Sequence, residues 1–266
     1  MVAKPVVVAA VMAPVMLQIT GLTKRFGGLA AISDVTLAFE AGTLTAVIGP
    51  NGAGKSTFFN LISGAITPDS GKVVFKGENI TGLNRAAIVR RGIGRAFQVA
   101  SFFPSMTVAE NLQAAIAAHR GQWADLNHRF PRQGVRARAQ EVAEMLGLQD
   151  SANVLSANLS HGDQKLLDIA LALALEPSML LLDEPTAGMG PEERWRMIEK
   201  VQRLWQLQNL TLVFIEHDMD IVFGISSSIR VLCYGRVLAE GTPDEIRANP
   251  AVIEAYLGTP EPEDDA

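Results

Sequence analysis

The stretch GPNGAGKS, Gly49 to Ser56, separates a short apolar run, LTAVI (44–48), from a run of helix-forming residues, TFFNLIS (57–63). It fits the pattern G-x-x-x-x-G-K-[ST] in the context that the pattern requires, directly after a strand and at the start of a helix. Glycines in such a loop let backbone N–H groups converge on phosphate oxygens, and the helix start adds the positive end of its dipole. The order strand, loop, helix therefore predicts a phosphate-binding loop in an α/β fold.

The residues of this loop have distinct expected roles. Lys55 supplies positive charge to the β- and γ-phosphates of a nucleotide, and Ser56 can hold Mg²⁺. The residues expected to bind ATP through the loop are Gly49, Pro50, Asn51, Gly52, Ala53, Gly54, Lys55, Ser56 and Thr57. The alternative is a glycine-rich loop that binds no nucleotide, and the flanking strand and helix argue against it.

A second element, MLLLDEP (179–185), is an apolar strand that ends in the acidic pair Asp183 and Glu184. In a doubly wound sheet the carboxyl end of this strand lies beside the phosphate-binding loop. Asp183 is expected to bind Mg²⁺, commonly through water, and Glu184 to act as the base that orients and polarises the attacking water. An acidic pair at a strand end is weak evidence alone, but together with the loop it indicates phosphoryl transfer.

Two isolated polar residues also follow expected strands. Gln98 closes GIGRAFQ and His217 follows TLVFIE, and a parallel sheet brings both positions to the same edge. Taken alone, a glutamine or histidine at a strand end is usually a structural polar group whose hydrogen bonds are satisfied.

The rest of the chain supports an α/β fold with two additions. Apolar strands at 179–183, 211–216 and 228–235 alternate with helices, which predicts a mostly parallel sheet covered on both faces. KVVFKG (72–77) follows the turn TPDSG and predicts an antiparallel β element. Helical spacing dominates from about 102 to 175, in VAENLQAAIAAH (108–119), VRARAQEVAEMLGL (135–148) and HGDQKLLDIALALAL (161–175). The predicted fold class is a P-loop NTPase (RecA-like) core with a mostly parallel sheet, an antiparallel β subdomain and an inserted α-helical subdomain.

Composition excludes some classes of partner. The net charge is −5, with 23 basic and 28 acidic residues and no basic stripe, which argues against nucleic acid as a partner. The single cysteine, Cys233 in SIRVLCYG, cannot form an internal disulfide and is predicted to be a buried strand thiol. In the helix expected over 191–207, Trp195, Ile198, Val201 and Trp205 recur at helical spacing and are predicted to pack in the core.

Three segments are expected along the chain. Residues 1–15 are predicted to be a dispensable extension or a start codon placed too early, with Met12 and Met16 as candidate starts, because the apolar stretch is too short to span a bilayer and no convincing cleavage site follows it. Residues 16–258 form one domain, with a core of about 16–100 and 176–258 and a helical subdomain of about 101–175. Residues 259–266 are an acidic tail.

Five motifs occur in a family-specific order: GPNGAGKST, RAFQ, LSHGDQK, MLLLDEP and EHD. Together they resemble the nucleotide-binding subunit of an ABC transporter, over nearly the whole chain after about Leu17. KRFGGLAAISDV, RAFQVASFFPSMTVAENL and EGTPDEIRANPAVIEAYLG are most similar to the ATPase subunits of branched-chain amino-acid import systems.

The resemblance assigns roles to residues outside the phosphate-binding loop, with ATP and Mg²⁺ as cofactors. It implies that Phe26 stacks on adenine, although a loop-anchoring role is the alternative. Gln98 would bind Mg²⁺, sense the γ-phosphate and link the core to the helical subdomain. His217 would brace the γ-phosphate beside Glu184. FFPSMTVAENL (102–112) would receive a short helix of the membrane partner, and packing in the core is the alternative for its phenylalanines.

The same resemblance gives LSHGDQK (159–165) a role in a head-to-tail dimer, where it reaches the γ-phosphate that the other subunit holds. The implied contacts in trans are Ser160, His161, Gly162 and Asp163. The common pattern has two glycines and a glutamine, so His161 and Asp163 are departures, and His161 is interpreted as a lineage feature rather than a catalytic or pH-sensing residue. In TAGMGP (186–191), Gly190 stands where many relatives have an aspartate that contacts the other subunit.

The resemblance implies an ATP-binding and hydrolysing subunit that powers import of branched-chain amino acids or a related small polar solute. Its partners would be integral-membrane permease subunits, a second ATPase subunit that is identical or similar, and indirectly a solute-binding protein; its place would be peripheral, on the cytoplasmic face of the inner membrane. Alternatives are a soluble ABC ATPase without a transport role, an inactive cassette that acts as a scaffold, and a cargo such as urea-like solutes, amides or aromatic acids. The inactive cassette is opposed by the joint presence of Lys55, Asp183, Glu184 and His217.

Overall fold

Two sheets organise the part of the chain that the computed structural model describes, residues 14–96, 102–122 and 131–257. The spatial order of the central, six-stranded sheet is β10 (Arg236–Gly241), β9 (Ser228–Cys233), β3 (Leu44–Ile48), β8 (Thr211–Ile215), β7 (Met179–Asp183) and β6 (Ile93–Ala96). All neighbouring pairs in this sheet are parallel except β10 and β9, which are antiparallel at one edge. The predicted mostly parallel α/β sheet is confirmed.

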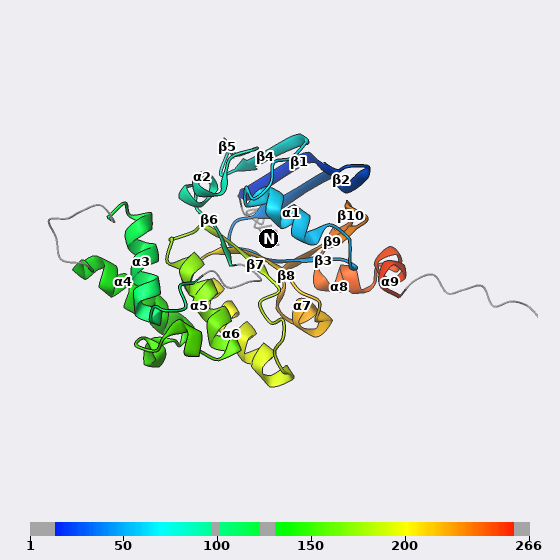
Figure 1. The fold of residues 1–266 in the computed structure, drawn as a ribbon. Helices are drawn as coiled ribbons and strands as arrows, with labels where there is room; N and C mark the ends of the chain where they lie inside the picture. The colour runs from blue at the N-terminus through cyan, green and yellow to red at the C-terminus, as the bar shows by residue number, and fades with distance from the viewer. Residues whose placement is uncertain (1–13, 97–101, 123–130, 258–266) are drawn as a thin grey trace, which may run out of the picture.

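The second sheet is antiparallel and lies above the central sheet in Figure 1. Its order is β2 (Leu29–Glu40), β1 (Val15–Phe26), β4 (Ser70–Phe75) and β5 (Glu78–Asn79). Strand β4 confirms the antiparallel element predicted at 72–77. The long strands β1 and β2 have no counterpart among the predicted elements; register shifts between them interrupt the alternation of apolar and polar residues, which is regular only in short runs such as VTLAFE (35–40).

Helix α1 (Lys55–Ile62) lies between the two sheets (Figure 1). Its Phe58 and Phe59 are fully buried in a hydrophobic cluster that also contains residues of β1, β2 and one face of the central sheet. The central strands contribute alternate residues to opposite faces: Val213 of β8 joins this cluster, whereas Phe214 joins the cluster on the other face. Both faces of the central sheet are therefore buried, as its nearly continuous apolar strands require.

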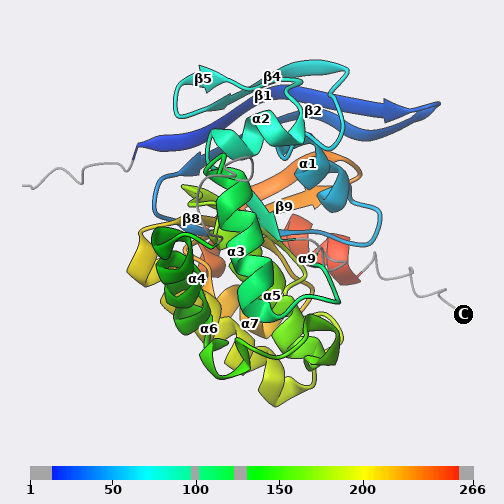
Figure 2. The same ribbon diagram turned by 60° about the vertical axis from the view of Figure 1, so that its left-hand side comes forward.

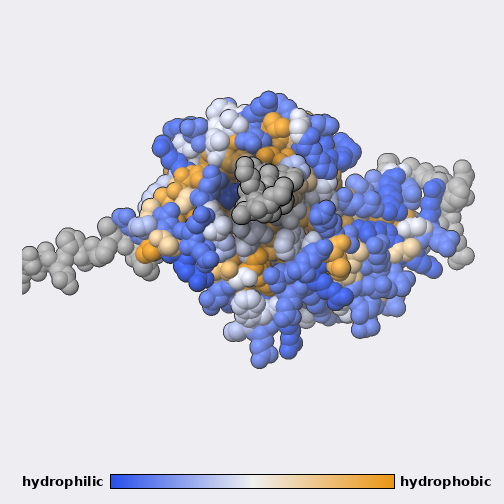
Figure 3. Space-filling model, turned by 180° about the vertical axis from the view of Figure 1, so that it is seen from behind, coloured by the Kyte–Doolittle hydropathy of each residue, from blue (hydrophilic) through white to orange (hydrophobic). Residues whose placement is uncertain are grey.

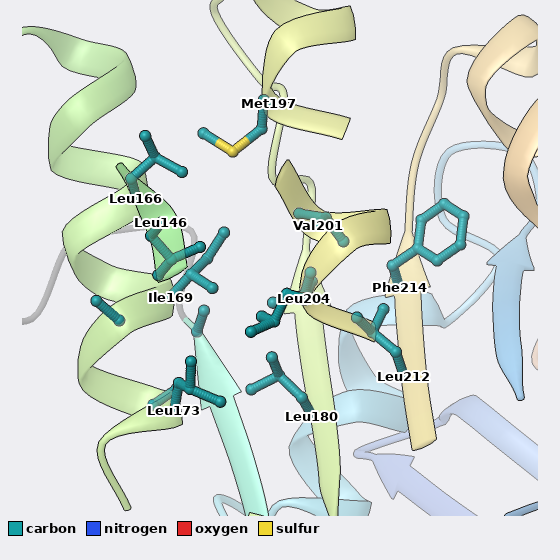
Figure 4. Close-up of a cluster of buried hydrophobic side chains, with 14 of the residues drawn as sticks. Leu146, Leu166, Ile169, Leu173, Leu180, Met197, Val201, Leu204, Leu212 and Phe214 are labelled. Carbon is teal, nitrogen blue, oxygen red and sulfur yellow. The ribbon is translucent and has the colours of Figure 1, made fainter. Parts of the chain in front are cut away.

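Helices cover the other face of the central sheet, and Figure 2 shows α3, α4 and α5 close together at the front of the molecule, below the antiparallel sheet. The remaining helices are α2 (Arg85–Arg90), α3 (Val108–His119), α4 (Gln133–Leu146), α5 (His161–Leu173), α6 (Pro191–Gln208), α7 (Met219–Ile225), α8 (Pro243–Arg247) and α9 (Pro250–Leu257), with short 3₁₀ turns at Gln149–Ser151 and Ser156–Asn158. In Figure 4, Leu173 of α5 and Leu204 of α6 meet Leu180 of β7 in this cluster. Helix α3 spans the predicted residues, and α4 and α5 end within two residues of their predicted ends.

Two predictions of burial were wrong. In α6, Ile198 and Val201 are buried and Trp205 packs against the same core cluster, as predicted, with its Nε1–H donated to the Gly42 carbonyl at 2.9 Å. Trp195, by contrast, is 44% exposed. Cys233 is likewise only partly buried, since it is the last residue of β9 before the turn into β10.

The surface is mainly polar on the face shown in Figure 3, where hydrophobic residues form smaller patches among hydrophilic ones. Among the described residues, no helix is both long enough and apolar enough to cross a membrane.

Candidate active site

A cleft of about 490 Å³ lies over the loop that joins β3 to α1. Its lining comes from segments that are far apart in the sequence: Phe26, Leu29, Ala30, Ala31, the loop residues 51–57, Glu184, His217 and Tyr234. The structure thus brings the predicted phosphate-binding loop, Phe26, the second acidic residue and the strand-end histidine to one cleft.

Close backbone contacts on both sides shape the phosphate-binding loop. Gly54 has φ +100°, and a Cβ there would lie 2.5 Å from the Ala31 carbonyl oxygen of β2. A Cβ on Gly49 would collide with the Leu232 carbonyl oxygen of β9. In addition, the N–H of Gly235, in the turn between β9 and β10, donates to the Ala53 carbonyl at 3.0 Å. Gly49 and Gly54 are therefore required by the surrounding backbone as well as by the approach of phosphate.

Lys55 is the buried cation of the loop. Its Nζ donates to the carbonyls of Gly49 at 2.6 Å and Pro50 at 3.1 Å, across the curve of the loop. Burial lowers the pKa of Lys55, and the negative charges of Glu184 and Asp183 oppose this shift. The two carboxylates thus favour the charged form of Lys55. A cation held at the start of a helix suits the binding of a triphosphate.

Asp183 is buried at the end of β7 and forms an ion pair that the motifs did not reveal. Arg95 of β6 donates from Nη2 to Asp183 Oδ2 at 2.8 Å, and both side chains are less than one tenth exposed. Arg95 Nη1 also donates to Asn60 Oδ1 at 2.8 Å and Ser63 Oγ at 3.0 Å, both in or next to α1. Arg95 therefore links the acidic strand to the helix that follows the phosphate-binding loop. The sequence contained one sign of this ion pair, a charged residue inside the otherwise small and apolar segment GIGRAF.

Glu184 and His217 form a close pair in the cleft. His217 Nε2 lies 2.9 Å from Glu184 Oε1, within hydrogen-bond distance. Glu184 has φ +50°, an uncommon conformation for a residue other than glycine, and its N–H donates to the Ile215 carbonyl at 3.1 Å. Backbone strain that the neighbouring strand holds in place is typical of functional side chains.

The outer part of the cleft carries two aromatic side chains. Phe26, at the end of β1, is 51% exposed, and Tyr234, at the β9–β10 turn, is 87% exposed with φ +48°. Both line the cleft. Tyr234 was not predicted as a site residue, because no sequence motif marks a turn whose position over the loop depends on the pairing of β9 with β3.

Phe26 gives a prediction that separates base recognition from phosphate recognition. Phe26→Ala is expected to raise the Kd for ATP on the order of 10-fold, because stacking of a base on an aromatic ring contributes roughly 1–3 kcal/mol. Binding of inorganic tripolyphosphate, which has no base, should stay unchanged, and Phe26→Tyr should behave like the wild type. Calorimetric titration of each variant with both ligands checks this. An equal loss for both ligands would mean that Phe26 only anchors its loop.

The segment LSHGDQK lies outside the cleft lining. Ser160 is the N-cap of α5: its Oγ accepts from the Asp163 N–H at 3.1 Å and donates to Asp163 Oδ2 at 2.9 Å. Ser160 and His161 are exposed, whereas Gly162 is buried against Glu193 of α6, whose carboxylate would collide with a Cβ at this position. The chain does not bring these residues to its own phosphate-binding loop, which is the arrangement that contact in trans needs.

The segment that follows β6 contains two predicted features, Gln98 and the phenylalanines Phe102 and Phe103. Gln98 lies outside the described residues. Phe102 is partly buried against the core, while Phe103 is 60% exposed, so the two phenylalanines divide between the two alternatives considered for them.

Comparison with known proteins agrees with this geometry. Residues 32–187 match the family model described as ABC transporter, and residues 236–262 match one described as branched-chain amino acid ATP-binding cassette transporter. The high-affinity branched-chain amino acid transport ATP-binding protein LivG of Salmonella typhimurium is 41% identical over 91% of this chain and 98% of its own length.

Solved structures give the same result. A cassette of an ABC transporter in its ADP conformation has a TM-score of 0.81 and 30% identity, covering 92% of this chain and 100% of its own. A dimeric bacterial ABC transporter cassette has a TM-score of 0.74 and 26% identity, covering 86% of this chain and 99% of its own.

Proposed function

The chain belongs to the family of ABC transporter ATP-binding subunits, and from this premise we propose that two such subunits close on two ATP molecules to drive import of branched-chain amino acids through membrane partners. The subunit is an ATPase of an import system. The observation that best supports the proposed catalytic roles is the pair formed by Glu184 and His217, 2.9 Å apart in a cleft that also contains Lys55.

In the proposed mechanism the phosphate-binding loop holds the triphosphate, with Lys55 compensating charge on the β- and γ-phosphates. Glu184 accepts a hydrogen bond from the attacking water and polarises it, while His217 fixes the Glu184 carboxylate and contacts the γ-phosphate. Phosphoryl transfer asks the protein mainly for positioning and charge compensation, which this arrangement of fixed groups can supply.

The donors at the site fit Mg²⁺. Ser56 lines the cleft at the start of α1, and the buried Asp183, whose Oδ2 accepts from Arg95, lies at the end of β7 directly before the cleft residue Glu184. Mg²⁺ prefers oxygen ligands and usually binds through one or two protein groups together with waters and substrate phosphates. When bound, the ion would neutralise developing charge on the phosphates; Ser56 and Asp183 would hold it, with Gln98 as a further predicted ligand.

The proposed dimer pairs each phosphate-binding loop with the LSHGDQK segment of another copy or a similar chain. Support comes from the exposed Ser160 at a helix N-terminus, outside the chain's own cleft. The membrane partners would contact the segment 102–112, where Phe103 is exposed, and this would place the subunit peripherally on the cytoplasmic face of the membrane. Its similarity to LivG of Salmonella typhimurium, a branched-chain amino acid transport ATP-binding protein, supports that cargo class.

Transport by the reconstituted complex tests this proposal. The subunit, its permease partners and their binding protein are placed in proteoliposomes with ATP on the cassette side, and uptake of leucine, isoleucine and valine is measured against urea and simple amides. We expect ATP-dependent uptake of the branched-chain amino acids and its loss in the Glu184→Gln variant. Uptake of urea or amides alone would overturn the cargo, and uptake that persists in Glu184→Gln would overturn the motor role.

A further inference from the structure

Glu216 is a buried carboxylate for which the proposed mechanism has no role. It directly precedes His217 and is 4% exposed. Its Oε1 accepts hydrogen bonds from the N–H of Thr186 at 3.0 Å and from the Thr186 hydroxyl at 2.7 Å, and its Oε2 accepts from the N–H of His217 at 3.2 Å. A buried carboxylate is costly without donors, so these three bonds fix both of its oxygens.

The donors to Glu216 lie on the two loops that carry the catalytic pair. Thr186 is two residues after Glu184, in the loop that follows β7, and His217 is in the loop that follows β8. A second bridge joins the same two loops: Arg194 of α6 donates from Nε to the Met189 carbonyl at 2.9 Å and from Nη1 to Asp218 Oδ2 at 3.0 Å. Hydrogen bonds near both ends of the loop 186–190 thus join it to the loop that follows β8.

The loop 186–190 also contacts the start of α5. Gly188 has φ +81°, and a Cβ there would lie 3.3 Å from Cε1 of the His161 ring. A side chain at 188 would require that ring to give way by a few tenths of an ångström, so the imidazole lies close beside the loop. A continuous path thus runs from His161 to Gly188, along the loop backbone to Thr186, and through the hydrogen bonds of Glu216 to His217.

We propose that Glu216 is a positioning residue that transmits the position of the LSHGDQK segment to the catalytic pair of its own subunit. The inference rests on the proposed function, because it needs Glu184 and His217 to act on ATP and LSHGDQK to act in trans. The Glu216 carboxylate keeps the loop after β7 and the loop after β8 in a fixed relative position. A displacement of His161 therefore moves His217 and Glu184 together. Coupling carried by packed and hydrogen-bonded groups of this kind is detected by non-additive mutational effects.

Two substitutions remove the Glu216 link in different ways. Glu216→Gln keeps the shape of the side chain but turns one oxygen into an amide donor, which then faces a backbone N–H of Thr186 or His217. Thr186→Val keeps the volume and removes the hydroxyl. The matched controls are Glu199→Gln, an exposed position on α6, and Thr186→Ser, which retains the hydroxyl.

The readouts are kcat for ATP hydrolysis by the full-length chain, the Kd for a fluorescent ATP analogue, and Tm. For Glu216→Gln and Thr186→Val we expect kcat to fall on the order of 10- to 100-fold, because small misplacements of catalytic groups cost that much. The Kd should change by less than about 2-fold, since neither residue lines the cleft. Both controls should hydrolyse ATP like the wild type.

A double-mutant cycle tests the link to His161. The rate loss of His161→Ala combined with Glu216→Gln should be smaller than the product of the two single losses, because both break one series of contacts. Three results would overturn the inference. The first is a wild-type kcat in Glu216→Gln, and the second is an equal loss of kcat in Thr186→Ser and Thr186→Val. The third is a loss of kcat in the double variant that equals the product of the two single losses. Each of these results leaves the proposed function intact, since that function is judged by hydrolysis in the wild type and its loss in Glu184→Gln.

Discussion

Replacing Glu184 by glutamine is expected to lower the steady-state rate of ATP hydrolysis by about 100-fold or more, the lower range of what general base catalysis contributes. Glutamine has the same shape and can still contact His217, which lies 2.9 Å from Glu184 Oε1, but its amide cannot accept the proton of the attacking water. ATP binding should persist because the phosphate-binding loop is unchanged. The variant is therefore expected to accumulate as an ATP-bound dimer.

Two measurements check this outcome. Phosphate release gives the rate, and light scattering coupled to gel filtration gives the mass with and without MgATP. Glu199→Gln, on an exposed face of α6, controls for the loss of a negative charge. Hydrolysis at the wild-type rate in Glu184→Gln would mean that another group activates the water, and failure to bind ATP would mean that Glu184 supports the loop instead.

The second large effect is expected at Ser160. Ser160→Arg should abolish hydrolysis that depends on the dimer and leave the Kd of the single chain for ATP within about 2-fold, because Ser160 does not line its own cleft. The arginine would project from the exposed N-cap of α5 toward the site that the other subunit completes. Loss of the cap itself costs about 1 kcal/mol, so the fold should survive.

Ser160→Asp separates these two effects. Aspartate is a good N-cap, but its charge would face the γ-phosphate, so hydrolysis should also be lost in this variant. If Ser160 is only a helix cap, Ser160→Asp will hydrolyse ATP like the wild type.

Mixing two inactive variants tests the trans arrangement directly. In the proposed dimer, one Ser160→Arg chain and one Glu184→Gln chain together retain one complete site, formed by the loop of the first and the LSHGDQK segment of the second. Partial recovery of hydrolysis on mixing is therefore expected. Recovery would establish contact in trans, because two chains that acted only on their own ATP would both stay inactive.

Much of the fold and the site follows from short stretches of sequence. The strands β3, β7, β8 and β9 were predicted because each is a short apolar run ended by polar or glycine residues, and the central sheet buries such runs on both faces. The positions of Glu184 and His217 at one sheet edge followed from the same rule, and the structure brings them together. The strands β1 and β2 were not predicted, although buried residues alternate in VTLAFE (35–40) of β2; register shifts interrupt this alternation along the rest of the pair.

By itself, then, the sequence determined the phosphate-binding loop, the acidic strand end, the helical block and the family, because each is encoded by neighbouring residues whose spacing matches a local backbone geometry. Only the tertiary structure decided the partners of the buried charges: Arg95 with Asp183, and Glu216 with Thr186 and His217. It also decided that His161 lies beside Gly188 and that Trp195 stays partly exposed. These contacts join residues from separate strands and helices, so they depend on strand order and register, which no local pattern of residues specifies.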